Sequence, residues 1–329
     1  MKLAHFDYSL PKELIAQYPL TRRDACRLLV LNRKKETIEH RSFRDITEYF
    51  NRGDLLVLND TKVLPSRLIG KRLSGGRVEV LLLGNLSRLT FKALLKPRRL
   101  KVGEKIIFNG GEVSAKIVFK DEISFSAKDI DAVYALGAMP LPPYIKRNPE
   151  EIDSLYYQTV YAKKEGAIAS PTAGLHFTEE FIEEIESSGI DVAYLTLHVG
   201  VGTFKPVRVD DITRHRMEPE EFMIPERTIK SIEKARLEGA RIIAVGTTSL
   251  RALESFALGA KGGLTELFIY PGYKFNIADC LLTNLHLPRT TLFMLVCAFA
   301  GIELIKKAYQ EAIAKKYRFY SYGDAMLII

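Results

Sequence analysis

Three segments in the C-terminal half of the chain combine glycine with hydroxyl and ionisable side chains. They are residues 171–178 (PTAGLHFT), 195–204 (LTLHVGVGTF) and 317–324 (YRFYSYGD). Glycine lets a ligand approach the backbone closely, and imidazole exchanges protons near neutral pH. Polar groups of this kind are costly to bury in a core unless they have partners. The three segments therefore indicate the walls of a binding or catalytic pocket.

Four histidines are candidates for proton transfer. His176 lies between a glycine and a predicted helix start, His198 lies within a predicted apolar strand, and His286 lies in an Asn-Leu-His-Leu-Pro segment. The alternative for His198 is a core histidine with a hydrogen-bond partner, and for His215 it is a solvated loop residue. None of the four is spaced as HxH or HxxxH and no thiol is near them, so the sequence predicts no metal site.

The terminal segment 317–324 carries four aromatic residues, an arginine and an acid. Aromatic rings and arginine can stack on bases or pair with phosphates, whereas the alternative is a C-terminal strand that docks on the core. Asp324 follows Gly323 and precedes apolar residues. Because a carboxylate there needs a partner when it is buried, the segment favours a site.

These groups need a scaffold, and the pattern after residue 157 predicts alternating strands and helices. Strands are expected at 192–199, 241–245, 268–269 and 280–282, and helices at 178–189, 225–238, 250–258, 292–300 and 303–315. The apolar runs 27–31 and 54–58 are expected to join the same sheet. The sequence therefore predicts an α/β domain with a largely parallel sheet.

Ligands of open α/β sheets bind beyond the carboxyl ends of the strands. The predicted strands are followed there by 59–61 (NDT), 200–203 (GVGT) and 246–249 (GTTS). The last of these precedes a predicted helix and would present amides to an anion, although such a turn is also ordinary helix punctuation. No GxGxxG or GxxxxGK[ST] motif occurs, which argues against nicotinamide and nucleoside-triphosphate binding.

The intervening segment has a different pattern and a concentrated charge. Residues 62–105 hold 12 Lys or Arg against two acids, a net charge of +10 in a chain of +8. Short β-type runs at 77–83, 88–95, 105–108, 113–119 and 122–126 alternate with glycine turns, which predicts a small all-β barrel or sandwich. We expect it to be an inserted domain at 62–150, leaving 1–61 and 151–329 as a discontinuous α/β domain. The charge is typical of polyanion binding; a solvated basic face is the alternative.

Overall composition is that of an ordinary globular protein. The chain has 329 residues, of which 47% are hydrophobic and 27% charged, and three widely spaced cysteines. Such cysteines predict neither a disulfide framework nor a zinc site. No leader opens the chain, and the longest apolar run, 291–302, is too short to span a bilayer. We therefore expect a cytoplasmic enzyme or binding protein without a membrane segment.

The motifs, in their order, resemble a known family along the whole chain. Residues 54–62 (DLLVLNDTK), 141–145 (LPPYI), 157–161 (YQTVY), 171–178, 196–204, 244–249 (AVGTTS), 284–288 (NLHLP) and 317–324 closely resemble the S-adenosylmethionine:tRNA ribosyltransferase-isomerase family. Two positions depart from the usual family pattern. Glu218 stands where a second histidine is usual, which moves any acid or base role there to a carboxylate, and Leu285 replaces a phenylalanine.

The resemblance implies an enzyme of queuosine biosynthesis. Such an enzyme transfers and isomerises the ribosyl part of S-adenosylmethionine onto 7-aminomethyl-7-deazaguanine (preQ1) at the tRNA wobble position, giving epoxyqueuosine-tRNA, adenine and methionine. S-adenosylmethionine is then a consumed cosubstrate, and no cofactor is expected. The expected partner is tRNA carrying that base. A monomer is the expected oligomeric state, although the sequence leaves this open, as it does the binding order and the tRNAs used.

The chemistry implied by the resemblance needs a base near the 5′ carbon of the sugar and an acid that helps adenine leave. The hypothesised catalytic residues are His176, His198, Asp60 and Asp324, with their acid and base roles unassigned. Substrate-binding candidates are Thr172, Gly174, Gly200, Gly202, Thr203, Gly246, Thr247, Thr248, His286, Arg318 and Tyr322. Candidates for tRNA contact are Arg67, Lys71, Arg72, Arg77, Lys96, Arg98, Arg99 and Lys101.

Two other functions compete with this hypothesis. A non-catalytic RNA-binding protein would explain the basic segment but not the polar residues at so many strand ends. A methyltransferase would share S-adenosylmethionine, but the chain lacks the glycine-rich first turn of that fold.

Overall fold

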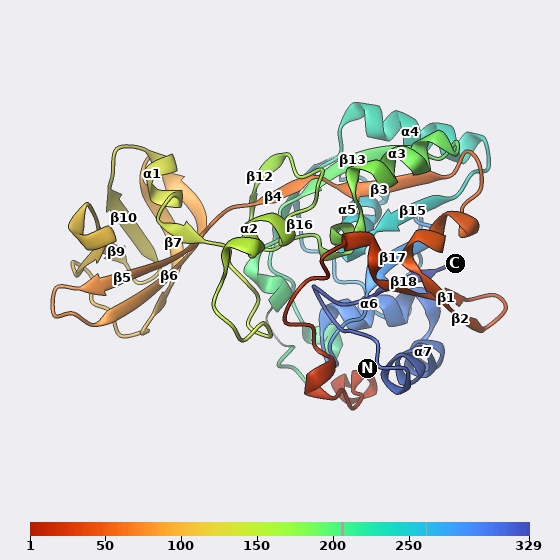
Figure 1. Ribbon diagram of the computed structural model, residues 1–329, viewed down its shortest axis with the longest axis horizontal. Helices are drawn as coiled ribbons and strands as arrows, with labels where there is room; N and C mark the ends of the chain where they lie inside the picture. Colours follow the sequence, from red (N-terminus) through yellow and green to blue (C-terminus); the bar gives the residue numbers. More distant parts are fainter. Residues whose placement is uncertain (205–206, 261) are drawn as a thin grey trace.

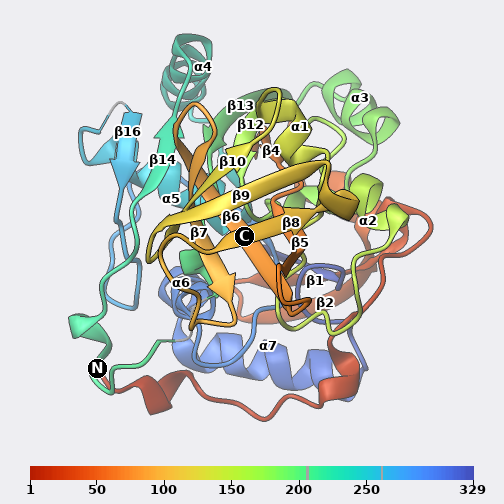
Figure 2. The same ribbon diagram turned by 90° about the vertical axis from the view of Figure 1, so that its left-hand side faces the viewer.

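The computed structural model describes residues 1–204, 207–260 and 262–329. A large α/β unit and a small β-barrel form its two parts, and the barrel projects from one end of the α/β unit (Figure 1). Seen from the barrel side, the barrel lies in front of the middle of that unit (Figure 2). None of the helices in the described ranges is both long and apolar enough to cross a bilayer.

Nine strands form the sheet of the α/β unit, in the order β16-β14-β13-β3-β15-β17-β18-β1-β2. The neighbours β13, β3, β15 and β17 run parallel, whereas β18 runs opposite to β17 and parallel to β1. The strands β2, β14 and β16 add antiparallel flanks. The bounds are β1 Arg27–Asn32, β2 Thr37–Ser42, β3 Leu55–Asn59, β13 Asp191–Leu197, β14 Glu220–Met223, β15 Ile242–Val245, β16 Gly262–Thr265, β17 Cys280–Asn284 and β18 Ala325–Ile328.

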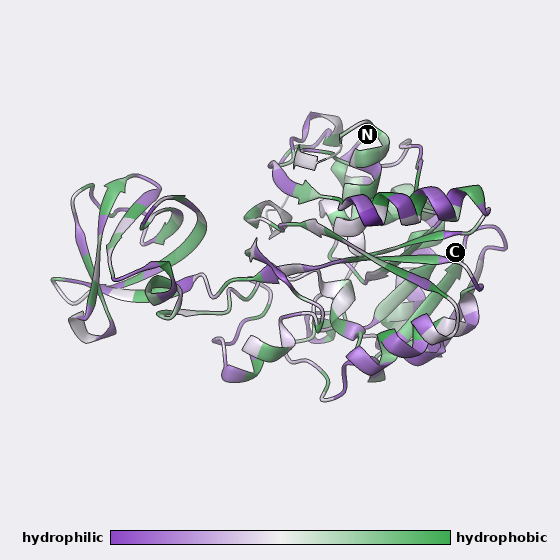
Figure 3. Cartoon of the chain, turned by 90° about the horizontal axis from the view of Figure 1, so that it is seen from above, coloured by the Kyte–Doolittle hydropathy of each residue, from purple (hydrophilic) through white to green (hydrophobic). Residues whose placement is uncertain are grey.

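Alternate side chains of the central strands enter two hydrophobic cores. In β3, Leu55 and Val57 belong to the first core and Leu56 and Leu58 to the second. Burial on both faces is why these strands read as continuous apolar runs in the sequence. In Figure 3 the central sheet strands are mainly green, whereas the long helix on the outside of the sheet alternates between purple and green.

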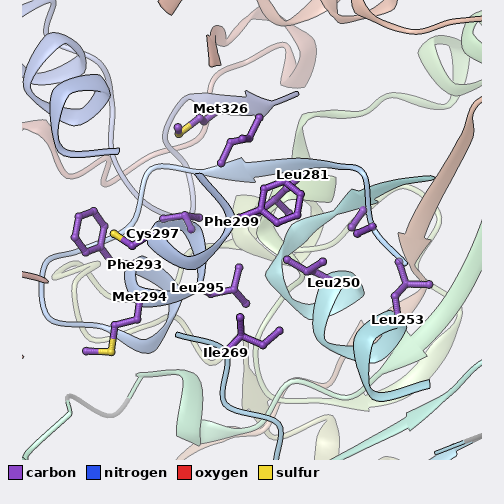
Figure 4. Packing of buried hydrophobic residues seen from close by; sticks show 14 of the residues in the cluster. Leu250, Leu253, Ile269, Leu281, Phe293, Met294, Leu295, Cys297, Phe299 and Met326 are labelled. Atoms are coloured by element: carbon purple, nitrogen blue, oxygen red, sulfur yellow. The ribbon is translucent and has the colours of Figure 1, made fainter. Parts of the chain in front are cut away.

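Helices from both halves of the chain complete these cores. The first core includes residues of α4 (Glu226–Leu237), α5 (Gly246–Ala257), α6 (Thr291–Ala300) and α7 (Ile302–Ala314). Figure 4 shows part of it, including Leu250 and Leu253 of α5 and Leu295 of α6. The second core includes residues of the 3₁₀ segment η4 (Phe43–Tyr49) and of α3 (Glu179–Ser187).

Six antiparallel strands close the barrel in the order β5-β6-β7-β10-β9-β8, and β8 returns to pair with β5. Their side chains form a separate core that contains Phe91, Phe108 and Phe125. The two-residue strand β11 adds to β5. The bounds are β5 Arg67–Arg72, β6 Arg77–Ser87, β7 Thr90–Lys96, β8 Lys105–Phe108, β9 Val113–Phe119, β10 Glu122–Ser126 and β11 Gly137–Ala138, with η5 Asn109–Gly111 and α1 Ile130–Tyr134.

A short parallel ribbon joins the two parts. Strand β4 (Thr61–Val63) continues from β3 toward the barrel and pairs with β12 (Lys164–Ala167). Val63, Leu141, Ile145 and Tyr157 form a fourth apolar cluster at this junction. The other short helical segments are η1 Leu3–Phe6, η2 Lys12–Leu14, η3 Arg23–Ala25, α2 Glu151–Tyr156, η6 Thr172–His176, η7 Val201–Phe204 and η8 Ile212–Arg214.

The predicted fold class is confirmed, because an α/β sheet with a parallel centre accompanies a separate closed β-barrel. Some local predictions were wrong. Residues 246–249 form the first turn of α5 instead of preceding it, and 268–269 form no strand. His198 follows β13 instead of lying within a strand. Strand β5 escaped notice because its apolar face consists only of Leu68 and Gly70 between exposed or half-buried residues.

One buried carboxylate holds the ends of two sheet strands together. Asp324, just before β18, accepts hydrogen bonds from the backbone N of Arg27 at 3.0 Å and from the backbone N of Arg318 at 2.7 Å. The Arg27 side chain adds bonds from Nε at 3.3 Å and Nη2 at 3.0 Å. Asp324 is 2% exposed, so these donors replace the water that its charge has lost. The contact fixes the chain between residues 318 and 324 against the start of β1.

We expect Asp324→Asn to lower the free energy of unfolding by roughly 3 kcal/mol, because Arg27 loses its counter-charge and an amide cannot accept from all four donors. Urea unfolding followed by circular dichroism measures the change. Glu233→Gln, at an exposed position of α4, is the control and should change it by less than about 0.5 kcal/mol. Equal small effects of both substitutions would contradict this role of Asp324.

Candidate active site

One edge of the large sheet gathers the polar segments. The parallel strands β13, β3, β15 and β17 all end at this edge, and β18 and β1 begin there because they run the opposite way. Residues that follow the first four strands therefore meet residues that precede the last two. The barrel projects beyond the same edge, since β3 leads through β4 into it (Figure 1). The topology thus places the polar strand ends between the sheet and the barrel.

A cavity lies at this edge, and we call it the edge cavity. Its polar wall comes from four places, namely residues 170–172, the start of α5, the end of β17 and the loop before β18. The Oγ atom of Ser170 and the Oδ1 atom of Asn284 are buried and make no hydrogen bond in the described structure. Buried polar atoms are usually paired. The lining residues are Tyr144, Tyr157, Ala169, Ser170, Pro171, Thr172, Ala173, Val199, Gly246, Thr247, Thr248, Thr283, Asn284, His286, Leu292, Tyr320 and Ser321.

His286 is the histidine in the wall of the edge cavity. Its Nε2 atom lies 2.8 Å from the hydroxyl of Thr283, and its backbone N donates to the Tyr309 hydroxyl at 2.9 Å. Burial lowers the pKa of His286 to about 3, because the charged imidazolium would lose its hydration. The imidazole is therefore neutral at pH 7.

His176 lies in a second, smaller cavity, the side cavity, which Arg23, Cys26, Tyr156 and residues 321–323 also line. Its Nε2 accepts from Nδ2 of Asn284 at 3.2 Å, so the ring proton is on Nδ1, which lies 3.2 Å from the Cys26 sulfur. Burial lowers the pKa of His176 to about 4. Asn284 lines the edge cavity, so this one amide connects His176 to it.

His198 and Asp60 lie on the barrel side of the sheet edge, and neither lines the edge cavity or the side cavity. The Nδ1 atom of His198 is 2.7 Å from the Thr61 hydroxyl, and partial burial lowers the pKa of His198. Asp60 accepts from the Thr196 hydroxyl at 2.6 Å. The structure thus separates His198 from His176, and Asp324 is occupied by Arg27 and Arg318 as described above.

The predicted binding residues divide in the same way. Thr172, Gly246, Thr247 and Thr248 line the edge cavity, and α5 begins there without a side-chain cap. Gly246 has a φ of +88°, which favours glycine at this position. The amides of the first turn and the positive end of the helix dipole are therefore available to an anion.

Other predicted binding residues contact protein groups. A Cβ on Gly174 would lie 1.9 Å from the Tyr161 hydroxyl, so glycine is required for packing there. Gly200 donates its N–H to Oε1 of Glu220 at 2.9 Å. A Cβ on Gly202 would lie 3.2 Å from Cβ of Glu218, so the departure from the family pattern at 218 lies beside the glycine loop. Thr203 belongs to η7, but its side chain is outside the described structure.

Two predicted residues of the terminal segment support its loop. Arg318 donates from Nη2 to the Tyr18 carbonyl, and burial lowers the pKa of Arg318. Tyr322 lines the side cavity and donates to Oδ1 of Asp153 at 2.8 Å. Asp153 in turn holds Arg147 in a two-bond ion pair. The loop 318–323 is therefore anchored on both sides.

The predicted tRNA-contact residues lie on the barrel and at its base. Arg67 and Lys96 share Glu79, and Arg72 pairs with Glu104. The remaining five cations form no ion pair within the described ranges; they are Lys71, Arg77, Arg98, Arg99 and Lys101, all exposed. Lys71 stands directly opposite Arg77 across β5 and β6, an arrangement that does not favour barrel stability.

Sequence reasoning missed several residues of the edge cavity. Asn284 ends β17, and its position at a strand end was a signal that could have identified it. Tyr144, Tyr157 and Ser170 come from loops whose position depends on the junction cluster, so the local sequence carried no signal for them. In the described ranges no three His, Cys, Asp or Glu side chains gather closely enough to hold a metal ion.

The depressed pKa of His176 predicts a pH dependence of stability. Unfolding restores an ordinary imidazole pKa near 6.5, so the unfolded chain takes up a proton between pH 6.5 and about 4 that the folded chain does not. The free energy of unfolding therefore falls as the pH falls through that window. We expect His176→Gln to reduce this loss by on the order of 1 kcal/mol per pH unit in urea unfolding between pH 7 and pH 5. His5→Gln, at an exposed position of η1, is the control; parallel curves for all three proteins would contradict the expectation.

Comparison with known proteins shows the family to which this chain belongs. A model of the family described as queuosine biosynthesis protein matches residues 3–328. The S-adenosylmethionine:tRNA ribosyltransferase-isomerases of Sulfurihydrogenibium sp. (strain YO3AOP1) and Aquifex aeolicus (strain VF5) are 52% and 47% identical, and both alignments cover 100% of each chain. A crystal structure of S-adenosylmethionine tRNA ribosyltransferase from Thermotoga maritima matches with a TM-score of 0.58 and 37% identity, over 99% of this chain and 100% of that one. The chain therefore belongs to the queuosine biosynthesis protein family and is a ribosyltransferase-isomerase.

Proposed function

We propose that this enzyme transfers and isomerises the ribosyl part of S-adenosylmethionine onto preQ1 at the wobble position of tRNA. Epoxyqueuosine-tRNA, adenine and methionine are the products. The observation that carries this proposal is the full-length relationship to enzymes named S-adenosylmethionine:tRNA ribosyltransferase-isomerase, at up to 52% identity. The edge cavity, at the sheet edge that faces the basic barrel, supports it.

The edge cavity has the groups that a sulfonium nucleoside needs. Its aromatic and aliphatic residues offer an apolar surface to adenine, and the unpaired oxygens of Ser170 and Asn284 offer acceptors to ribose hydroxyls. S-adenosylmethionine is consumed as a cosubstrate, so the proposed reaction needs no cofactor.

His286 is the proposed base for the 5′ proton that the sulfonium acidifies, because its imidazole lies in the wall of the edge cavity and is neutral at pH 7. His176 accepts a hydrogen bond from Nδ2 of Asn284 and so helps to hold this amide in the wall of the edge cavity. His198 and Asp60, on the barrel side of the edge, are the proposed contacts of the incoming base. Asp324 acts through the loop it anchors.

The barrel and the junction provide the RNA surface. A groove of about 570 Å³ lies between the barrel and the α/β unit, with Arg67, Lys96 and Arg147 among its lining residues. Pro143 and Ile145 line this groove, while Tyr144 between them lines the edge cavity. A nucleotide in the groove is therefore separated from the edge cavity by a single segment of chain. This arrangement suits an anticodon loop that presents one base to the enzyme.

Product analysis tests the proposed reaction. With S-adenosylmethionine and tRNA carrying preQ1, the enzyme should release adenine and methionine in equal amounts and add a ribosyl-derived group to the tRNA. His286→Gln should reduce turnover by about 10²-fold or more while S-adenosylmethionine affinity stays within a few-fold, because it removes proton transfer. His5→Gln is the matched control. S-adenosylhomocysteine as the product would indicate a methyltransferase, and no small-molecule product would indicate an RNA-binding protein.

The charge on the barrel predicts salt-dependent RNA binding. Replacing Lys71 and Arg77 with Ala should weaken tRNA binding and lower the slope of log affinity against log salt by about 2, since each phosphate contact contributes about one. S-adenosylmethionine affinity should not change. The matched control replaces Lys34 and Lys35, exposed cations in the β1–β2 turn at the opposite end of the sheet. Equal salt slopes in filter binding for the two double variants would refute a role of this barrel face.

A further inference from the structure

The guanidinium of Arg251 is buried, and one of its nitrogens has no partner among the described residues. Arg251 lies in α5 and is 4% exposed. Its Nη1 donates to Oε2 of Glu220, and its Nε donates to the carbonyl of Leu267 at 3.0 Å. Its Nη2 atom is buried and has no hydrogen-bond partner in the part of the chain that the structure describes. A buried charged donor without an acceptor is costly, so the arrangement indicates an acceptor that comes from outside the chain.

Arg251 faces a space that adjoins the edge cavity. It lines a small cavity beside α5, the α5 cavity, together with Thr247, Thr248, Phe268, Leu292 and Leu295. Thr247, Thr248 and Leu292 also line the edge cavity, so the two cavities share a wall. The uncapped first turn of α5 contributes its amides and the positive end of its dipole at this point. An anion here would meet both an unpaired guanidinium nitrogen and a helix N-terminus.

The apolar lining of the α5 cavity favours a carboxylate over an RNA phosphate as the anion that Arg251 binds. Its other walls are largely apolar side chains from residues 267–269 and from α6. A small carboxylate on an aliphatic chain fits such surroundings, because the chain covers apolar surface while the charge pairs with Arg251. An RNA phosphate is joined on both sides to nucleotides that must stay hydrated, so it does not suit this small apolar cavity. The exposed cations of the barrel suit an RNA phosphate better.

We propose that Arg251 Nη2 and the first-turn amides of α5 bind the α-carboxylate of S-adenosylmethionine. The methionyl chain then lies along the α5 cavity and the nucleoside lies in the edge cavity. This inference rests on the proposed function and adds the subsite for the amino-acid part of the cosubstrate. Glu220 positions Arg251 and, through Gly200, links this subsite to the glycine loop after β13.

A cycle of two ligands and two proteins tests the contact. One change removes the carboxylate from the ligand, and the other removes the guanidinium from the protein. The probes are S-adenosylmethionine and its decarboxylated analogue, measured by calorimetry on the full chain without tRNA. We expect the wild-type chain to bind the analogue at least tenfold more weakly, since a charged hydrogen-bonded pair is lost. Arg251→Met should bind both probes within about threefold of each other. Arg227→Met, at an exposed position of α4, should keep the wild-type preference.

Two further measurements distinguish loss of the contact from a folding defect of the Arg251→Met variant. The comparison of the two probes on the wild-type chain needs no variant. The double variant Glu220→Gln with Arg251→Met removes both charges of the buried ion pair and should also bind both probes alike. Equal affinities on the wild-type chain, or a preference that survives Arg251→Met, would overturn the inference. A loss of tRNA affinity instead would assign Arg251 to a phosphate and overturn it as well.

The outcomes also separate this inference from the proposed function. A chain that prefers S-adenosylmethionine through Arg251 but releases no adenine with tRNA would support the subsite and contradict the ribosyl transfer. Release of adenine without any effect of Arg251→Met would support the transfer and contradict the subsite.

Discussion

The carboxylate of Asp324 is the contact on which the site depends. It binds the start of β1 through Arg27 and the backbone of Arg318, and so closes the loop 318–323 against the sheet. Tyr320 and Ser321 of this loop line the edge cavity, and Tyr322 and Gly323 line the side cavity. Because the carboxylate is buried, it is held by charge pairing and N–H donors in place of water. One ionic contact thus sets a wall of both cavities.

Strand direction explains why such distant segments meet. If β18 ran parallel to β17, the loop before it would lie at the opposite edge of the sheet, away from His286. Its reversal brings the C-terminal loop beside the ends of the parallel strands. The insertion of the barrel after β3 uses the same edge, because β3 ends there. The proposed cosubstrate cavity and the proposed RNA surface are therefore neighbours by topology.

The protein also separates its charges by environment. The imidazoles of His176 and His286 lie in the interior, where burial keeps them neutral at pH 7. The unpaired cations of the barrel remain in water, where counterion release favours RNA. Arg251 differs from both groups, since it is a buried cation. It donates one hydrogen bond to Glu220, and its Nη2 has no acceptor among the described residues. The buried groups suit the proposed cosubstrate S-adenosylmethionine, and the exposed cations of the barrel suit the proposed tRNA substrate.

The sequence by itself determined the apolar strands, most helices, the barrel and its charge, because burial on two faces and the period of two leave local patterns. It also located the polar strand ends from Asp60 to His286. Only the tertiary structure decided which of these share a cavity. His286 lines the edge cavity while His198 does not, and Asn284 and Arg251 are held by partners far away in the chain. Hydrogen bonds and burial across 31 to 108 residues of separation leave no local pattern, so they are fixed only when the sheet is assembled.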